Sequence, residues 1–230
     1  MNPEPATTPR FFVLEEGIVG SRYDADVDRL EPIHLGDGAC CARCGYPVGM
    51  PTWLPPHRVE LVLYGQELGD LIEVGGDELL VSERFARAFR EEGLTGLEGF
   101  HPVEVARVSR ERRGPVPTDV PRYVVATVCL GRGAVDLTRS RIRYGETPTC
   151  EECRSAGAEA IHGFTLEADT WRGEDIFQPR GLSGVWTVSE RFERLVARHG
   201  FTNMRLTPSE EYMWRPLGPE PQPTPKPASP

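Results

Sequence analysis

The feature of this sequence that most constrains its fold is a pair of Cys-x-x-Cys motifs that lie more than a hundred residues apart. The first motif is Cys41–Cys44 and the second is Cys150–Cys153. Two cysteines separated by two residues can hold one metal ion from a tight turn, and two such turns complete a tetrahedron of thiolates. If both motifs bind the same ion, the fold must bring two distant segments of the chain together at one point.

A shared site predicts one structural zinc ion per chain. The four predicted ligands are Cys41, Cys44, Cys150 and Cys153. Four sulfur ligands leave zinc no open position for water or substrate, whereas a catalytic ion normally keeps one. Ordering the long loop between the motifs costs roughly 4 kcal/mol, and structural zinc binding releases on the order of 10–16 kcal/mol at neutral pH. The long loop therefore does not prevent the site from forming.

Two further cysteines and two other interpretations of the motifs stay open. Cys40 neighbours Cys41 and could replace it as a ligand, although its spacing to Cys44 is less usual. Cys129 lies in an apolar run and is expected to be a buried thiol. The motifs could instead form a redox-active dithiol, but the sequence around them lacks a thioredoxin-like βαβ pattern. They could also be buried cysteines that hold no metal.

Charge and hydropathy narrow the class of protein. The 230 residues carry a formal net charge of −9, which weighs against a nucleic-acid backbone as the main partner, because that partner requires a basic surface. No segment approaches the roughly 18 apolar residues of a membrane helix. The polar, Pro-rich segment 1–10 lacks the apolar core of a secretion signal. We therefore expect a cytoplasmic protein without a membrane partner, in which thiols stay reduced and metal binding is favoured over disulfides.

Several segments of the chain recur in the same order. Val81–Phe85 is identical to Val188–Phe192, and Pro9–Val13 parallels Pro121–Val125. In each half of the chain, one Cys pair lies between the Pro segment and the Val segment. Ordered similarities of this kind are typical of an internal duplication with small insertions. The sequence thus predicts two half-repeats that pack as one zinc-stapled domain. The predicted boundaries are a flexible N-terminus 1–8, first half-repeat 9–109, linker 110–120, second half-repeat 121–216 and a Pro-rich disordered tail 217–230.

Each half has the pattern of a strand, a polar stretch, a Cys pair, a strand, a short helix and a strand. Ser82 and Ser189 are good helix N-caps, and Gly93 and Gly200 stand where left-handed residues would end the helices. The 24 glycines and 22 prolines favour short strands joined by turns. The predicted fold is α+β: internally duplicated, with antiparallel sheets, short capped helices and a zinc-ribbon-like site of four cysteines.

Catalytic motifs are missing from the sequence. Gly181–Val185 approaches a nucleophile elbow but lacks its final glycine. No Gly-rich phosphate loop occurs, and none of the five histidines forms a His-Glu-x-x-His pair. We therefore predict that the protein is not an enzyme.

Three motifs together resemble the myxobacterial double-CxxCG family. They are the paired Cys motifs, the segment Trp53–Leu61 after the first pair, and the Ser-Glu-Arg-Phe helix followed by Gly-Leu-Thr-Gly. The resemblance extends from about Arg10 to Leu217. The chain departs from the pattern at Arg154, where the motif has a glycine that accepts a positive φ without strain.

Members of the double-CxxCG family are described as immunity proteins of swarming-inhibition toxin systems. The resemblance implies that this chain binds a cognate toxin protein in the cytoplasm and neutralises it by occlusion, with zinc in a purely structural role. The surface that meets the toxin is not predicted, because such interfaces vary while the scaffold stays the same.

Other functions remain possible from the sequence alone. A non-catalytic zinc-ribbon-like module could bind nucleic acid or regulate another protein, using arginines that would project from one strand face and a basic loop at 110–113. Those arginines are Arg139, Arg141 and Arg143. An enzyme whose site is assembled from scattered residues is a further alternative.

Overall fold

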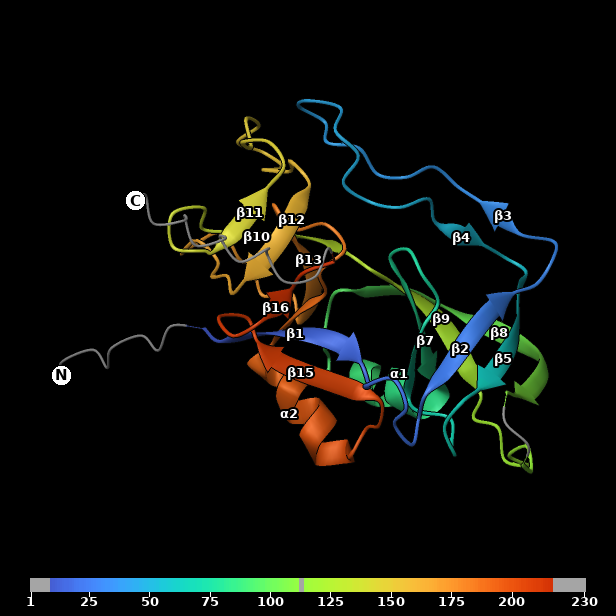
Figure 1. The fold of residues 1–230 in the computed structure, drawn as a ribbon. Helices are drawn as coiled ribbons and strands as arrows, with labels where there is room; N and C mark the ends of the chain where they lie inside the picture. Colours follow the sequence, from blue (N-terminus) through green and yellow to red (C-terminus); the bar gives the residue numbers. More distant parts are fainter. Residues whose placement is uncertain (1–8, 112–113, 217–230) are drawn as a thin grey trace, which may run out of the picture.

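The structure is a computed structural model, and it describes residues 9–111 and 114–216. The predicted N-terminal segment 1–8 and the predicted Pro-rich tail 217–230 lie outside the described residues, as do residues 112–113 of the predicted linker. Within the described residues the chain is mostly β-sheet, with two short helices packed beneath the sheets (Figure 1).

Two large sheets form the body of the molecule. In spatial order, the six-stranded sheet contains β2 (Ala25–Arg29), β5 (His57–Leu63), β8 (Leu97–Arg110), β9 (Tyr123–Val128), β7 (Glu78–Ser82) and β6 (Leu71–Glu73). The five-stranded sheet contains β10 (Leu130–Ala134), β13 (Ile176–Arg180), β14 (Thr187–Ser189), β1 (Phe11–Glu16) and β15 (Met204–Pro208).

Two smaller sheets lie above this body in Figure 1. One contains β11 (Ile142–Tyr144), β12 (Ala158–His162) and β16 (Met213–Trp214). The other contains only β3 (His34–Leu35) and β4 (Trp53–Leu54). β3 and β4 belong to an extended arm, residues 31–56, which leaves the six-stranded sheet and reaches toward the loops around β11 and β12.

Alternating burial confirms the predicted strand at β5, where Val59, Leu61 and Leu63 are buried and the residues between them are partly exposed. Most strand pairs are antiparallel, as predicted, but β5 pairs with β8 and β10 pairs with β13 in parallel. A parallel pair needs a long crossover connection. The connection from β5 to β8 passes through β6, β7 and a helix, which sequence periodicity alone does not reveal.

The two predicted helices are confirmed as α1 (Glu83–Glu91) and α2 (Glu190–His199). The Ser82 hydroxyl accepts a hydrogen bond from the Phe85 N–H, and the Ser189 hydroxyl accepts one from the Phe192 N–H. Gly93 and Gly200 have φ values of 65° and 59°, so both helices end at a left-handed glycine as expected.

The first strand of each predicted half lies in the sheet of the other half. β1 pairs with β14, with Phe11 opposite Ser189, and β9 pairs with β7, with Tyr123 opposite Ser82. On their other sides, β1 pairs with β15 and β9 pairs with β8. The two strands therefore occupy corresponding positions in the same register. Because of this exchange, neither half has a complete sheet of its own.

One hydrophobic core joins both halves. Phe85 and Phe89 of α1 meet Phe192 of α2, with a centroid distance of 5.8 Å between the Phe85 and Phe192 rings. All three rings are almost fully buried, and they belong to a core that also takes side chains from β1, β7, β9 and β14. Since the exchanged strands and both helices share this core, we expect the halves to unfold together.

A buried carboxylate precedes each helix. The Asp175 carboxylate accepts hydrogen bonds from the Ser189 hydroxyl at 2.7 Å, the Thr95 N–H at 3.0 Å and the Arg191 guanidinium at 3.0 Å. Its side chain is only 1% exposed. Thr95 follows α1, whereas Ser189 and Arg191 begin α2. The carboxylate thus ties the end of one helix to the start of the other.

The equivalent contacts surround Asp70 at the start of α1. Its carboxylate accepts from the Ser82 hydroxyl at 2.6 Å and from the Thr202 N–H at 2.8 Å, and it forms an ion pair with Arg84. Thr202 follows α2, so each carboxylate joins the start of one helix to the residues after the other helix. Backbone hydrogen bonds repeat the pattern, because Ser82 N–H donates to the Asp70 carbonyl and Ser189 N–H to the Asp175 carbonyl.

The arginines of these two clusters also cap the opposite helix. Arg191 donates to the carbonyl of Glu92 at 2.9 Å, and Arg84 donates to the carbonyl of His199 at 3.3 Å. Cations at a helix C-terminus satisfy free carbonyls and complement the helix dipole. Each helix therefore depends on a residue at the start of the other.

Glu16 predicts a pH-dependent stability. Burial raises the pKa of Glu16 from its usual 4.5 to about 7, although hydrogen bonds from the Glu73 N–H and the Asn203 amide oppose the shift. The folded state holds the proton of Glu16 up to a higher pH than the unfolded state does. The free energy of unfolding therefore falls as pH rises from about 4.5 to 7. We expect Glu16→Gln to reduce the stability difference between pH 5 and pH 8 by about 1–2 kcal/mol, allowing for solvent screening.

Urea denaturation of both proteins at the two pH values measures this effect. The other titrating groups are common to both proteins and cancel in the comparison. An unchanged pH dependence in Glu16→Gln would contradict the role given to this carboxyl.

Candidate metal centre

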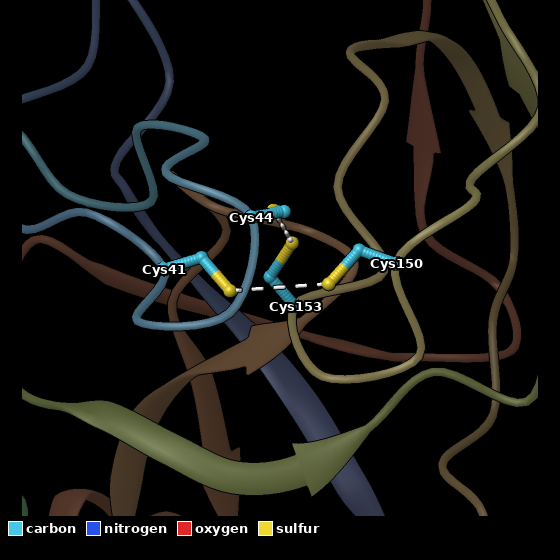
Figure 2. Close-up of side chains that lie close together, drawn as sticks. All are labelled: Cys41, Cys44, Cys150 and Cys153. Atoms are coloured by element: carbon cyan, nitrogen blue, oxygen red, sulfur yellow. Dashed lines mark hydrogen bonds between the residues drawn. The ribbon is translucent and has the colours of Figure 1, made fainter.

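The first Cys pair lies at the tip of the arm. The Gly45 N–H donates to the Cys41 carbonyl, and the Cys41 N–H donates to the Tyr46 carbonyl, both at 2.8 Å. These bonds close a tight turn in which Gly45 has a φ of 74°. The turn directs the Cys41 and Cys44 side chains to the same side, toward the second pair (Figure 2).

The base of the arm is held on the six-stranded sheet. Trp53 is buried, and its backbone N–H donates to the Glu78 carboxylate at 2.8 Å. The guanidinium of Arg29 lies 4.7 Å from the centroid of the Trp53 ring. The Met50 N–H donates to the Asp77 carboxylate at 2.7 Å. Most of the residues between the base and the Cys turn are exposed. The position of the tip therefore depends on its contacts with the second Cys pair.

The second Cys pair lies in the loop between β11 and β12. The Arg154 N–H donates to the Cys150 carbonyl at 2.9 Å, the same bond that Gly45 makes in the first turn. Arg154 has a φ of 55°, so the departure from the glycine of the motif does not change the geometry of the turn. Its guanidinium donates to the Val135 carbonyl at 2.8 Å and to the Glu167 carboxylate at 2.7 Å. These bonds offset the cost of the left-handed conformation.

The four sulfur atoms meet in one cluster. All lie within 4.8 Å of one another, with 3.9 Å between the sulfurs of Cys41 and Cys150 and 3.6 Å between those of Cys44 and Cys153 (Figure 2). A tetrahedral zinc site with Zn–S bonds of about 2.3 Å has sulfurs about 3.8 Å apart. The donor set and its spacing therefore fit a tetrahedral metal ion. Both distances far exceed the roughly 2.05 Å of a disulfide bond.

The other two cysteines do not belong to the cluster. Cys40 is exposed, and its sulfur lies 4.0 Å from the Gly38 carbonyl oxygen. Cys129 is half-buried, and burial raises the pKa of its thiol to about 11. Of the two candidates for the first ligand position, the structure therefore brings Cys41 into the cluster and leaves Cys40 outside.

The thiols of the cluster differ in acidity. The Cys153 and Glu152 N–H groups lower the pKa of Cys150 to about 6, with further help from the neighbouring thiols. The Tyr46 N–H lowers the pKa of Cys44, but burial and the three other thiols outweigh it and raise that pKa to about 12. At neutral pH the cluster thus combines a thiolate with at least one protonated thiol. Metal binding would release protons and strengthen as pH rises.

Gly45 gives a direct test of the turn geometry. A Cβ atom at this position would meet nothing within 4 Å, so Gly45→Ala changes only the conformational preference of the backbone. We expect it to cost about 1 kcal/mol, or roughly fivefold in zinc affinity. Competition with a chromophoric chelator measures the affinity. Gly184→Ala is a matched control, because Gly184 also has a positive φ and free space but lies outside the cysteine turns.

Other predicted binding features are not brought to the centre. The prediction that three arginines share a strand face is wrong, because β11 begins at Ile142 and Arg139 lies in a turn. Arg141 donates to the Glu210 carbonyl at 3.3 Å, and Arg143 pairs with Glu159 at 3.2 Å. Elsewhere in the described residues, no three His, Cys, Asp or Glu side chains cluster closely enough to hold a metal.

The sequence matches no protein-family model and no curated protein. Neither helix in the described part of the chain is long and apolar enough to cross a membrane. The evidence for a function therefore comes from the structure, where the cysteine cluster indicates metal binding.

Proposed function

We propose that this protein is a non-catalytic immunity protein that binds a cognate toxin in the cytoplasm and blocks it by occlusion. The observation that carries the proposal is the four-cysteine cluster, formed by two equivalent turns. The first turn has the full CxxCG pattern, and the second has Arg154 in place of the glycine. A centre closed by four sulfurs suits a structural ion, because no ligand position is left for a substrate.

We propose zinc as the metal and an internal duplication as the origin of the two halves. Zinc prefers four thiolates in a tetrahedron, and the reduced cytoplasm keeps them available. The reciprocal Asp70 and Asp175 clusters and the exchanged strands β1 and β9 support the duplication. In this proposal the ion fixes the arm to the second half and so gives the molecule a rigid surface.

Occlusion requires a preformed surface of suitable charge. The net charge of −9 would attract a basic toxin and speed the encounter. Rigid surfaces lose little conformational entropy on binding, which favours tight complexes. We propose that zinc contributes to toxin binding through this rigidity rather than through direct contact.

Co-expression with the toxin candidate encoded by the neighbouring gene tests the proposal. We expect the full-length protein to restore growth of bacteria that produce the candidate, and the purified pair to form a complex in calorimetry. The Cys150→Ser variant should bind more weakly, and Cys40→Ser should bind normally. If neither rescue nor complex formation occurs, and the protein instead binds DNA in a salt-dependent manner, the immunity proposal fails in favour of a nucleic-acid-binding module.

A further inference from the structure

A cavity of about 290 Å³ lies beside the cysteine cluster. Its walls come from both Cys turns and from the strands β10 and β13 of the five-stranded sheet. This volume is just below the usual range for small-molecule sites, roughly 300–1,000 Å³. The proposed function does not use this cavity, yet some of its polar groups have no partner within the described part of the chain.

Gln178 of β13 lines the cavity and carries a side-chain donor without a partner in the described residues. Its side chain is almost fully buried, with 2% of the residue exposed. The side-chain oxygen accepts a hydrogen bond from the Gly184 N–H at 2.6 Å, which fixes the orientation of the amide. The Nε2 group is buried and has no hydrogen-bond partner among the described residues. A buried donor without an acceptor costs about 1–3 kcal/mol, which a bound acceptor would recover.

Two arginines line the same cavity. Arg180 is held in place because its Nε donates to the Arg132 carbonyl and its Nη1 to the Glu152 carbonyl, both at 3.1 Å. Its Nη2 makes no hydrogen bond within the described residues. The Arg132 side chain is exposed and takes part in no ion pair or hydrogen bond within those residues. The cavity therefore presents two sets of guanidinium donors. Arg180 is held in position by backbone carbonyls, and the donors of Arg132 are not used within the described residues.

Charge and shape indicate which ligand these groups would take. The two arginines share the cavity with one carboxylate, Glu152, whose oxygen lies 3.8 Å from Arg180. Glu152 already brings one negative charge into the cavity, so a monoanion fits better than a phosphate dianion. The rest of the wall is largely apolar and includes Val48, Leu130 and Pro179. A planar carboxylate suits guanidinium and amide donors, and an apolar stem suits the remaining wall.

We propose that this cavity binds a carboxylate carried on a short apolar stem, held by Arg132, Arg180 and the Nε2 group of Gln178. The carboxylate belongs either to a free small acid or to the C-terminus of a polypeptide that ends in an apolar residue. The inference concerns the chain alone and does not depend on a toxin partner.

Titration of the zinc-loaded, full-length protein, followed by two-dimensional NMR, tests the inference. The probes are 4-methylpentanoate, its neutral amide, and the peptide acetyl-Ala-Ala-Leu with either a free or an amidated C-terminus. We expect at least one free acid to bind and to shift the Gln178 side-chain amide signals. The matching amide should bind at least tenfold more weakly, since it lacks the charge that pairs with the guanidinium groups.

Arg132→Gln should weaken binding of that acid at least tenfold. Arg172→Gln is the matched control, because Arg172 is equally exposed but lies outside the cavity. Unchanged zinc content and melting temperature would show that both variants are folded. Tighter binding of the peptide acid identifies a polypeptide terminus as the ligand, and binding of 4-methylpentanoate alone identifies a small acid.

Three results would overturn the inference. They are the lack of binding by either acid up to about 10 mM, equal binding of acid and amide, and equal behaviour of Arg132→Gln and Arg172→Gln.

Discussion

Replacing Cys41 or Cys150 with serine is expected to abolish stoichiometric zinc binding and to lower the free energy of unfolding by about 3 kcal/mol or more. Each substitution removes one of four ligands, and a hydroxyl is a far poorer ligand for zinc than a thiolate. For a chain of this size the melting temperature should fall by about 6–12 °C. Native mass spectrometry gives the metal content, and thermal denaturation gives the stability.

The double variant decides whether the two pairs share one ion. If they do, Cys41→Ser combined with Cys150→Ser costs little more than either change alone, because the ion is already lost. If each pair binds its own metal, the two costs add. Cys40→Ser provides the control, since Cys40 is exposed and lies outside the cluster. One zinc ion per chain is expected in this control, and full metal content in the Cys150→Ser variant would contradict the shared site.

Replacing Asp175 with alanine is expected to destabilise the fold by about 2–4 kcal/mol. The change leaves the Ser189 hydroxyl and the Thr95 N–H without their acceptor in the interior, and it removes the partner of Arg191. Asp70→Ala should have a similar cost, because its carboxylate makes the equivalent contacts at the other helix. Urea denaturation measures both values.

Asp37→Ala is the control for these two variants. Asp37 is exposed and lies in the arm, so its replacement should change stability by less than about 0.5 kcal/mol. Because each carboxylate ties the two helices together, both variants should still unfold in one transition. A second transition, or a much smaller cost for one aspartate than for the other, would contradict the reciprocal arrangement.

Local features of the sequence were enough to predict the helices and the cysteines of the cluster, apart from the choice between Cys40 and Cys41. Ser82 and Ser189 mark helix starts because a serine hydroxyl satisfies a free N–H in the first turn. The Cys-x-x-Cys spacing predicts a turn whose sulfurs point the same way, and the four cysteines indeed meet. Such signals are readable because they depend on residues that are close together in the chain.

The sequence signal was weaker where partners are distant. Asp70 and Asp175 were not singled out, because a lone aspartate before a strand has no distinctive local pattern. Their similar positions, 11 residues before Val81 and 13 residues before Val188 in the two Val-Ser-Glu-Arg-Phe segments, could have pointed to them. The prediction of an arginine row was wrong because the alternation of arginines from Arg139 to Arg143 was interpreted as one strand. In the structure, Arg139 lies in a turn before that strand begins.

The sequence by itself determined the caps of the two helices and the turns of the two cysteine pairs, since each follows from interactions within a few residues. The structure was needed to show that Cys41, and not Cys40, joins the other three thiols. Only the tertiary structure decided that β1 and β9 exchange sheets, that two strand pairs are parallel, and that Gln178 and Arg180 line a cavity beside the cysteines. These features depend on which distant surfaces pack best against each other. Strand pairing and core packing settle that choice collectively, and no local pattern encodes it.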